Sequence, residues 1–496
     1  MADMRKGVIP MLLCLCTCAA ENTVASRMSS QTSTRPVYTE LVPPDKLKED
    51  LDFLFKTIEE VHPNMYAYID KEEFDLLREE LNKNIESSVN RLQFYKLAAP
   101  VVASLKNGHT FIKPPITFFQ DYALKEGKFF PLEMQIEEAR VILSKHSGPY
   151  DLPLGAEVLT IDDQVASEFL RKAASYSPSE GRAYNLAVLQ RKSMLPFYLW
   201  LEKGSENSLG LEVKMSNGQG KKKYDIKALT YKEIVSYQKS LADKMETDVT
   251  SKPENSLYSH RYLQVHDTSI IEFNMFHDMQ QFKEFLRQTF TEIHDNNVSN
   301  LIIDIRKNPG GSSSLGDELL KYLTDKPFRQ FESVQIKMSR QLCKAHPGLR
   351  KSYPRAKMGS MVTMEGGFKQ ADNRPLRFKG RVFLLIGPKS ASSSVSFASA
   401  MKHFHIGTLI GQETIDTPVN YGDIIYEKLP HSGLTFAVAC KRFVCVGGKT
   451  DGRGLLPHYE IRQKQGDTSK SVDTVLQFTL DLIRDDGTVL DMRMVN

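Results

Sequence analysis

The C-terminal half of the chain alternates apolar, strand-like runs with amphipathic helical patterns. Three apolar runs, "TSIIEFNMF" (268–276), "NLIIDIR" (300–306) and "RVFLLIG" (381–387), are separated by longer mixed segments. Between the first two runs, apolar residues recur every three or four positions from Phe282 to Ile293, as on one face of a helix. Helices that return the chain between strands make those strands parallel. From about residue 261 the sequence therefore predicts an α/β fold with a mostly parallel sheet covered by helices.

Two loops rich in glycine and serine follow strands of this predicted sheet. "IIDIRKNPGGSSS" (302–314) leads out of one strand, and "LLIGPKSASSSVSFA" (384–398) joins another strand to a helix. Paired glycines let backbone N–H groups approach a ligand closely, although they also serve as ordinary turns. A serine at a strand-to-helix junction presents its hydroxyl outward, but serine is also a common helix N-cap. Because functional groups gather at the carboxyl ends of parallel strands, both loops are candidate site elements.

The first half of the chain has a different pattern of predicted helices and strands. Helical patterns are expected from Leu47 to Val61, over 71–85, and over 90–106 with a bend or break at Pro100. Together they predict a small helical N-terminal domain over 41–115. Strand patterns, a strand–turn–helix segment and a hairpin with a glycine-rich turn follow within 116–245, before a polar linker.

The N-terminus is typical of a secretory signal peptide. Arg5 and Lys6 precede a short apolar run that ends near Cys16, and small residues follow. We expect residues 1–25 to be removed by cleavage after Ala20 or Ala25, and 26–40 to form a flexible leader. Lipidation at Cys18 and a buried N-terminal helix are the alternatives. The apolar run is too short to span a bilayer, so no integral membrane span is expected after signal removal.

Composition and charge exclude several classes of protein. The chain has 496 residues, of which 41% are hydrophobic, and its net charge is only +4, so nucleic acid is not an expected partner. The cysteines outside the predicted signal peptide are odd in number and have no metal-type spacing, which predicts no disulfide framework. His403 and His405 offer two metal ligands without a third nearby, so no metal is expected.

Four motifs together resemble one family. They are "NLIIDIRKNPGGS", "RVFLLIGPKSASSSVSFASAMK", "GTLIGQET" and "GGKTDGRGLLPHYEI", in that order within 261–465. This order and spacing is similar to that of the tail-specific or C-terminal processing serine peptidases (family S41) and their tricorn-like relatives. The resemblance implies a ClpP/crotonase-like α/β serine peptidase core over 255–496. "LPLGAEVLTIDDQ" (152–164) resembles the centre of a PDZ domain, which would then occupy 116–245.

The resemblance also implies the nucleophile and its oxyanion donors. The family's serine ends an "SAS" triplet 19 residues before the glycine of "GxxT", which corresponds to Ser392 here. Ser390, Ser393 and Ser394 then become loop and N-cap residues. The oxyanion would be held by backbone N–H groups of Gly310 or Gly311 and of Ser393.

The expected base is a histidine. Many processing peptidases use a lysine 25 residues after the nucleophile, but Thr417 stands there and no lysine occurs from 403 to 427. The tricorn-like branch uses the histidine of an upstream "HT" motif, which corresponds to His109 in "LKNGHT". Asp451 takes the place of the family's orienting glutamate, although it is also a plausible turn aspartate before glycine; Glu413 is the alternative.

The sequence therefore predicts an exported serine endopeptidase that needs no cofactor and acts on peptide or protein substrates. The PDZ-like domain would capture an extended peptide or a chain terminus by strand addition. A retinoid-binding interphotoreceptor protein is built on the same fold, so a catalytically silent binding or carrier protein is the alternative. Ligand capture by the PDZ-like region alone is a third possibility.

Overall fold

A six-stranded sheet forms the centre of the C-terminal half. The computed structural model describes residues 39–137, 140–181, 194–215, 220–242, 256–463 and 472–485. The sheet order is β12-β13-β14-β17-β18-β21, and every pairing from β13 onward is parallel. The strands are β12 (Tyr258–Leu263), β13 (Thr268–Phe273), β14 (Asn300–Asp304), β17 (Arg381–Ile386), β18 (Thr408–Gly411) and β21 (Tyr459–Glu460). The mostly parallel sheet predicted from the apolar runs is confirmed.

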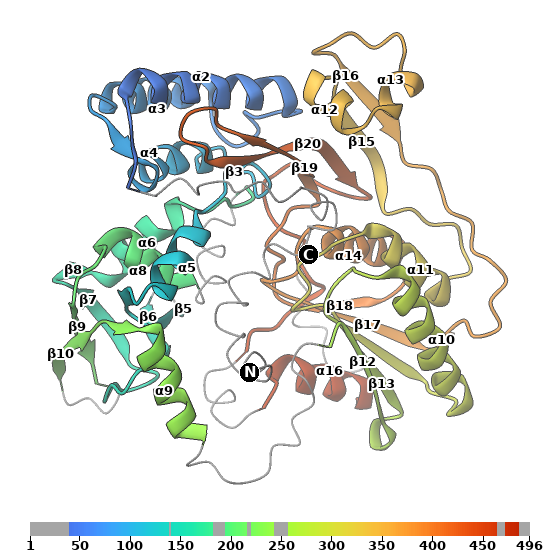
Figure 1. The fold of residues 1–496 in the computed structure, drawn as a ribbon. Coiled ribbons are helices and arrows are strands. Elements are labelled where there is room, and N and C mark those ends of the chain that lie inside the picture. Colours follow the sequence, from blue (N-terminus) through green and yellow to red (C-terminus); the bar gives the residue numbers. More distant parts are fainter. Residues whose placement is uncertain are drawn as a thin grey trace, which may run out of the picture.

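Helices cover both faces of this sheet (Figure 1). Because successive strand residues point to opposite faces, Ile303 and Leu384 pack under one set of helices while Ile302 and Leu385 pack under the other. The first set is α10 (Met279–Asp295), α11 (Ser313–Leu323) and α14 (Ser393–His403), and the opposite face is covered by α16 (Thr474–Arg484). Asp278 caps α10 by accepting a hydrogen bond from the Gln281 N–H.

A second sheet, which the sequence analysis did not identify, lies between the core and the N-terminal helices (Figure 1). It has the order β16-β15-β20-β19, and a short strand from the N-terminal region pairs antiparallel with β20. The members are β3 (Phe111–Ile112), β15 (Phe331–Lys337), β16 (Met361–Glu365), β19 (Val419–Lys428) and β20 (Thr435–Cys445); α12 (Arg340–Ala345) and α13 (Gly348–Ser352) join β15 to β16.

The three predicted N-terminal helices are present. They are α2 (Pro44–Val61), α3 (Lys71–Asn84) and α4 (Arg91–Ala103), and the short strands β1 (Leu41–Val42) and β2 (Val89–Asn90) pair beside them. Pro100 lies in the last turn of α4, and Asn90 opens that helix with a reciprocal capping box. The apolar core of these helices continues into Phe436 and Val438 of β20. The helices therefore share their core with the second sheet.

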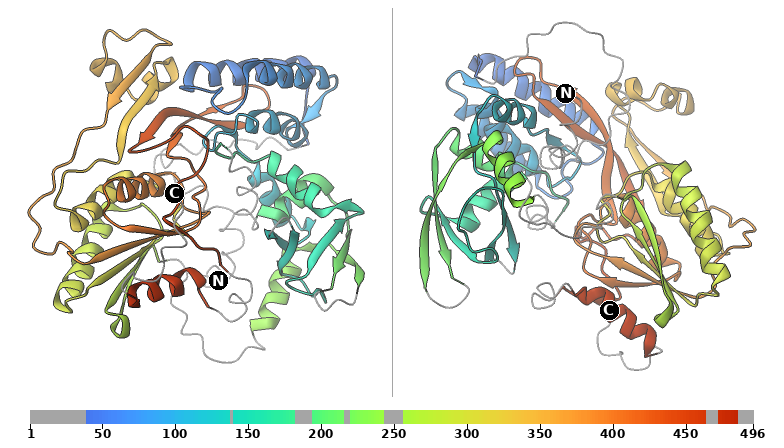
Figure 2. Two further views of the ribbon diagram at one scale, coloured as in Figure 1. Left: turned by 180° about the vertical axis from the view of Figure 1, so that it is seen from behind. Right: turned by 60° about the horizontal axis from the view of Figure 1, so that its bottom comes forward.

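The described residues between 116 and 242 build an antiparallel sheet with its own core (Figure 2). Its order is β10-β9-β7-β6-β5, with β8 beside β7. The elements are α5 (Ile116–Leu124), β4 (Lys128–Phe129), β5 (Leu132–Glu137), β6 (Arg140–His146), β7 (Glu157–Ile161), β8 (Gln164–Val165), α6 (Ala166–Ser175), α8 (Leu195–Lys203), β9 (Ser208–Lys214), β10 (Lys221–Lys227), β11 (Leu229–Thr230) and α9 (Tyr231–Ala242). The predicted strand–turn–helix and hairpin are both seen here, while the PDZ-like assignment stays a prediction.

The predicted signal peptide and nearly all of the leader lie outside the described residues. Within the described part of the chain, no helix is both long and apolar enough to cross a membrane.

Candidate active site

Ser392 stands at the junction between β17 and α14 in a strained conformation. Its backbone angles are φ 51° and ψ −117°, in a region that residues with a side chain rarely adopt. The helix begins at the next residue, so the first amides of α14 point toward the space beside the serine. Strain of this kind persists only where the surroundings enforce it, and it is typical of a nucleophile on a sharp strand-to-helix turn.

Ser392 also differs from its neighbours in its hydroxyl. Ser390 Oγ donates to the Ile305 carbonyl at 2.9 Å, and Ser394 Oγ donates to the Asn308 carbonyl at 2.8 Å. Ser393 Oγ donates to the Gly311 carbonyl at 2.5 Å. Among the described serines from 390 to 396, only Ser392 has a hydroxyl without a protein partner. The hydroxyls of the neighbouring serines are therefore occupied by hydrogen bonds, and the hydroxyl of Ser392 is free to react.

The glycine loop packs directly against this serine. Gly310 has φ 104°, and a Cβ built there would lie 2.8 Å from the Ser392 Cβ. The buried Asn308 side chain fixes the loop: its Nδ2 donates to the Phe273 carbonyl at 2.7 Å, and its Oδ1 accepts from the Gly310 N–H at 2.9 Å. Because the Gly310 amide is engaged by Asn308, the Gly311 and Ser393 amides are the better candidates for oxyanion donors.

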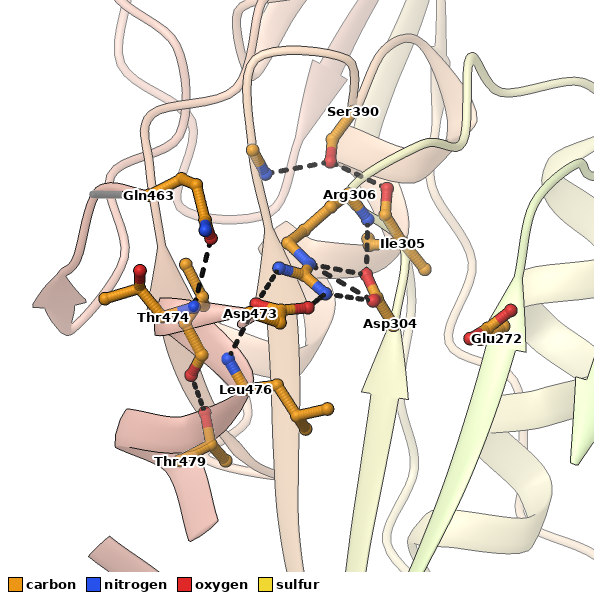
Figure 3. A network of polar contacts seen from close by, with 12 residues as sticks. Glu272, Asp304, Ile305, Arg306, Ser390, Gln463, Asp473, Thr474, Leu476 and Thr479 are labelled. Carbon is orange, nitrogen blue, oxygen red and sulfur yellow. Dashed lines mark hydrogen bonds and ion pairs between the residues drawn. The ribbon is translucent and has the colours of Figure 1, made fainter. Parts of the chain in front are cut away.

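A polar network behind the two loops ties them to the C-terminal helix (Figure 3). Arg306, just after β14, makes paired hydrogen bonds to Asp304 and to Asp473, with shortest distances of 2.6 Å to each. Asp473 also caps α16 by accepting from the Leu476 N–H at 3.0 Å. The Ser390 contact to Ile305 lies beside this network in Figure 3. The strand ends that carry the candidate site are thus braced from the opposite face of the sheet.

His109 reaches this region through the second sheet. It lies in the turn between α4 and β3, where the Thr110 N–H donates to the Asn107 carbonyl. Thr110 Oγ1 accepts from the Ala439 N–H at 3.1 Å, and β3 continues along β20 with Phe111 opposite Ala437. Nδ1 of His109 is buried and has no hydrogen-bond partner among the described residues.

Two buried carboxylates lie where the histidine turn meets the serine loop. Asp416 Oδ2 accepts from the Ser392 N–H at 2.6 Å, and Glu180 Oε2 accepts from the Gly108 N–H at 2.7 Å. A Cβ built at Gly108 would lie 3.3 Å from Glu180 Oε2 and 3.9 Å from Asp416 Oδ1. Both acids therefore lie close to Gly108, the residue that precedes His109.

Burial and mutual proximity shift both acids. Burial raises the pKa of Asp416, while the positive charge available on His109 and the Ser392 amide act in the opposite direction. Burial, followed by the neighbouring Asp416 charge, raises the pKa of Glu180 well above its ordinary value. Two carboxylates in one buried site favour a state in which one of them keeps a proton.

The other sequence-predicted residues lie farther out. Asp451 is exposed, its Oδ1 accepts from the Arg453 N–H at 3.0 Å, and the described structure records no hydrogen bond or ion pair between it and His109. Glu413 pairs with Arg453 at 2.8 Å. Thr417, at the place of the family's lysine, is buried and donates to the Val419 carbonyl at 2.5 Å. The orienting role of Asp451 stays a prediction.

Sequence reasoning missed Asp416 and Glu180. Asp416 is adjacent to the position of the family's lysine, which is the only local signal that points to it. Glu180 follows α6 in a polar stretch with no motif. Among the described residues, no group of three or more His, Cys, Asp or Glu side chains is arranged to hold a metal ion.

Comparisons with known proteins bear on the family and the fold. Residues 267–461 match the model of peptidase family S41, a range that begins just before β13 and ends just after β21. This part of the chain is therefore an S41 peptidase domain, and the resemblance predicted from the motifs is confirmed. No curated protein sequence matches the chain.

Solved structures share the fold at low identity. The crystal structure of mature CPAF is 14% identical with a TM-score of 0.63, covering 90% of this chain and 99% of that one. Mature CPAF complexed with lactacystin gives the same TM-score and identity over 89% and 99%. The photosystem II D1 C-terminal processing protease is 14% identical over 88% and 97%, with a TM-score of 0.43. The similarity to CPAF extends over the N-terminal half as well as the peptidase domain.

Proposed function

We propose that the protein is an exported serine endopeptidase in which Ser392 is the nucleophile and His109 the general base. The observation that carries the proposal is the strained Ser392, whose free hydroxyl stands at the start of α14 beside the Gly310–Gly311 loop. The proximity of His109 to the serine loop supports it, because Asp416, which accepts the Ser392 N–H, is near enough for the charge of His109 to lower its pKa. Asp451 is the orienting residue that the sequence predicts.

The reaction follows from these roles. Ser392 Oγ forms a bond to the substrate carbonyl carbon as its proton moves to His109, and the carbonyl π electrons move to the oxygen. The Gly311 and Ser393 amides stabilise that oxyanion. Collapse breaks the C–N bond, and His109 returns the proton to the leaving amine. A water molecule then hydrolyses the acyl-enzyme: it loses a proton to His109, which protonates Ser392 as the acid product leaves.

A serine-reactive fluorophosphonate tests the proposal. Wild-type protein is expected to be labelled once, on the peptide that contains Ser392, and Ser392→Ala is expected to abolish labelling. His109→Ala should slow labelling sharply, because a serine hydroxyl without a base is a poor nucleophile. Ser390→Ala should still be labelled at Ser392, because the Ser390 hydroxyl bonds only to backbone groups, those of Ile305 and Gly387, among the described residues. A folded wild-type protein that takes no label would favour the carrier function.

Peptide capture by the 116–242 region is a separate part of the proposal. The region presents the edge strands β10 and β5 of its own sheet, and an exposed strand edge can pair with an extended peptide. A long substrate with a free terminal carboxylate is expected to be cleaved with higher kcat/KM than its amidated form, whereas a short reporter peptide should show no difference. Equal values for both long substrates would contradict terminus capture.

Export is tested by the N-terminus of the mature chain. Mass analysis of protein recovered outside the cytoplasm is expected to find a start near Glu21 or Ser26, or an acylated Cys18. Recovery of an intact Met1 in that fraction would contradict the signal peptide.

A further inference from the structure

A strongly basic element, residues 333–364, projects from the second sheet. It holds seven Lys and Arg residues and no Asp or Glu, whereas the whole chain has a net charge of +4. The rest of the molecule is therefore net acidic, and the excess of positive charge is concentrated in this basic element. β16 is the edge strand of the second sheet, and α12 and α13 lie at the periphery of the molecule in each view (Figure 1 and Figure 2).

The cations of the basic element have no acidic partners. Six of the seven are exposed, and no ion pair joins any of these six to an acid among the described residues: Arg340, Lys344, Arg350, Lys351, Arg355 and Lys357. The acids at the end of the neighbouring helix α2 have other contacts. Glu59 pairs with Arg78 at 3.0 Å, and Glu60 accepts a hydrogen bond from Gln341 at 2.8 Å. The exposed positive charge is therefore available to an anionic partner from outside.

The basic element is small enough for its charges to act together. α12 and α13 contact each other and have six and five residues, which corresponds to about 9 and about 8 Å of helix. The turn that follows α13 folds back onto the start of the element, where the Gly359 N–H donates to the Met338 carbonyl at 2.7 Å. Because the Debye length is about 10 Å at 0.1 M ionic strength, the fields of cations this close together add.

Exposed apolar side chains accompany these cations. Met358 lies in the turn before β16 and Met361 is the first residue of that strand, and they are 47% and 46% exposed. The basic element also forms part of a cavity of about 500 Å³, whose apolar lining includes Ile336, Leu342 and Leu349. Cations next to exposed apolar side chains are the combination with which peripheral proteins bind anionic membrane surfaces.

We propose that the basic element docks the protein on the surface of a membrane that contains anionic lipids. The lipid phosphates pair with the exposed cations, while Met358 and Met361 enter the boundary between headgroups and acyl chains. An acidic peptide or a nucleic acid fits less well, because neither offers an apolar layer to the methionines. The one aromatic ring within 339–364, that of Tyr353, is partly buried rather than exposed for stacking on bases. The inference does not depend on the proposed peptidase function.

Sedimentation of the full-length protein with lipid vesicles tests the proposal. Vesicles of phosphatidylcholine alone are compared with vesicles that also contain phosphatidylglycerol, which is anionic. The wild-type protein is expected to bind the anionic vesicles at least about tenfold more tightly, and added salt should weaken this binding. Equal binding to both kinds of vesicle would overturn the proposal. Because every variant below has the same N-terminal segment, differences between variants report on the basic element alone.

A double charge variant separates the basic element from the charge of the whole protein. Each cation at an anionic surface contributes about fivefold to binding, so the double variant Arg355→Gln, Lys357→Gln should bind anionic vesicles about 10- to 25-fold more weakly. The matched control is Lys221→Gln, Lys223→Gln in β10, which removes the same charge from lysines that each pair with an acid. This control should lose less than about twofold. Equal losses in the two double variants would overturn the assignment to the basic element.

The methionines separate a lipid surface from an acidic polymer. The double variant Met358→Ser, Met361→Ser should bind anionic vesicles about fivefold or more weakly, with the salt dependence of binding unchanged, because apolar contact is lost and charge is kept. Unchanged binding would mean that charge alone acts, as it would toward an acidic peptide or a nucleic acid, and would overturn a lipid surface. All four substituted side chains of the basic element are exposed, so thermal midpoints and cleavage of a soluble reporter peptide should match those of the wild type.

Discussion

The serine side and the histidine side of the site are built in different ways. On the serine side, the loops after β14 and β17, which are neighbouring strands of one sheet, are hydrogen-bonded to each other through Ser390, Ser393 and Ser394. On the histidine side, a two-residue strand and the buried Glu180 hold a turn that originates in another part of the fold. The sheet itself builds the nucleophile's geometry, whereas the base depends on contacts between distant segments. Errors in packing should therefore misplace the base before the nucleophile.

The largest expected effect comes from breaking the serine side at its tightest point. Gly311 has φ 130°, and an added Cβ would lie 2.1 Å from the Phe276 carbonyl oxygen, so Gly311→Ala requires the backbone to move. We expect kcat/KM to fall by more than about 100-fold, since an oxyanion donor is displaced. Gly367→Ala is the control, because no atom lies within 4 Å of its added Cβ. Retained activity in Gly311→Ala would show that the serine side is less rigid than its contacts indicate.

A variant of Arg306 tests whether the serine side also depends on a contact between segments distant in the sequence. Arg306→Met would leave Asp304 and Asp473 without their partner; because the network is only partly buried, with Asp473 36% exposed, we expect a cost of about 1–3 kcal/mol. The free energy of unfolding in urea should fall accordingly, and hydrogen exchange should rise in α16. Arg462→Met is the matched control: its guanidinium is 74% exposed and pairs only with Glu460 among the described residues. Equal losses in both variants would argue that the network in Figure 3 contributes no more than a surface pair.

The difference between local contacts on the serine side and distant contacts on the histidine side also explains which parts of the fold could be predicted from sequence. The strands of the C-terminal sheet are continuous apolar runs, such as Leu301 to Ile303, so their class and parallel order follow from local pattern and motif. β3 has only two residues, Phe111 and Ile112, and pairs with β20 more than 300 residues later. No periodicity signals such a contact, and the second sheet was missed with it.

The acids near His109 show how much of the candidate site could be predicted from the sequence. Ser392 carries a motif, and Ser390 lies in the loop as expected, whereas Ser393 and Ser394 lie inside α14, whose N-cap position is Ser392. Asp416 and Glu180 can be recognised as candidate site residues only in the folded structure, where both are buried close together. The sequence alone shows neither their burial nor their proximity. Sequence reasoning named Asp451 from its motif position, which stays a prediction, and it could not identify acids that are set apart only by their burial.

The histidine side should respond to acid more than the serine side does. Burial lowers the pKa of His62, at the end of α2, to about 3, compared with about 6.5 in an unfolded chain. Between these values the unfolded state binds more protons, so the stability contributed by neutral His62 is present above pH 6.5 and is lost as pH falls. From pH 7 to pH 5 this amounts to about 2 kcal/mol.

Comparison with His62→Asn isolates this contribution. The acids Asp416 and Glu180 have raised pKa values and oppose the trend, so the quantity to measure is the difference between wild type and variant in urea midpoints at the two pH values. The wild-type protein should lose more stability on acidification than His62→Asn. Parallel losses in both proteins would place the acid sensitivity elsewhere and remove this distinction between the two sides.

The smallest expected effect concerns the hydroxyl that docks the histidine turn onto β20. Thr110→Val keeps the shape of the side chain but leaves the Ala439 N–H without an acceptor in a buried position, at a cost of about 1–2 kcal/mol. Because the turn carries His109, kcat should fall a few-fold with KM nearly unchanged, and Thr110→Ser, which retains the oxygen, should restore most of it.

On the serine side, Ser394→Ala removes one comparable hydrogen bond, to the Asn308 carbonyl. Several other bonds hold that loop, so kcat of this variant should change less than that of Thr110→Val at a similar loss of stability. Steady-state kinetics and thermal midpoints of the three variants measure these effects. A larger fall in kcat in Ser394→Ala than in Thr110→Val would mean that the nucleophile is more easily misplaced than the base.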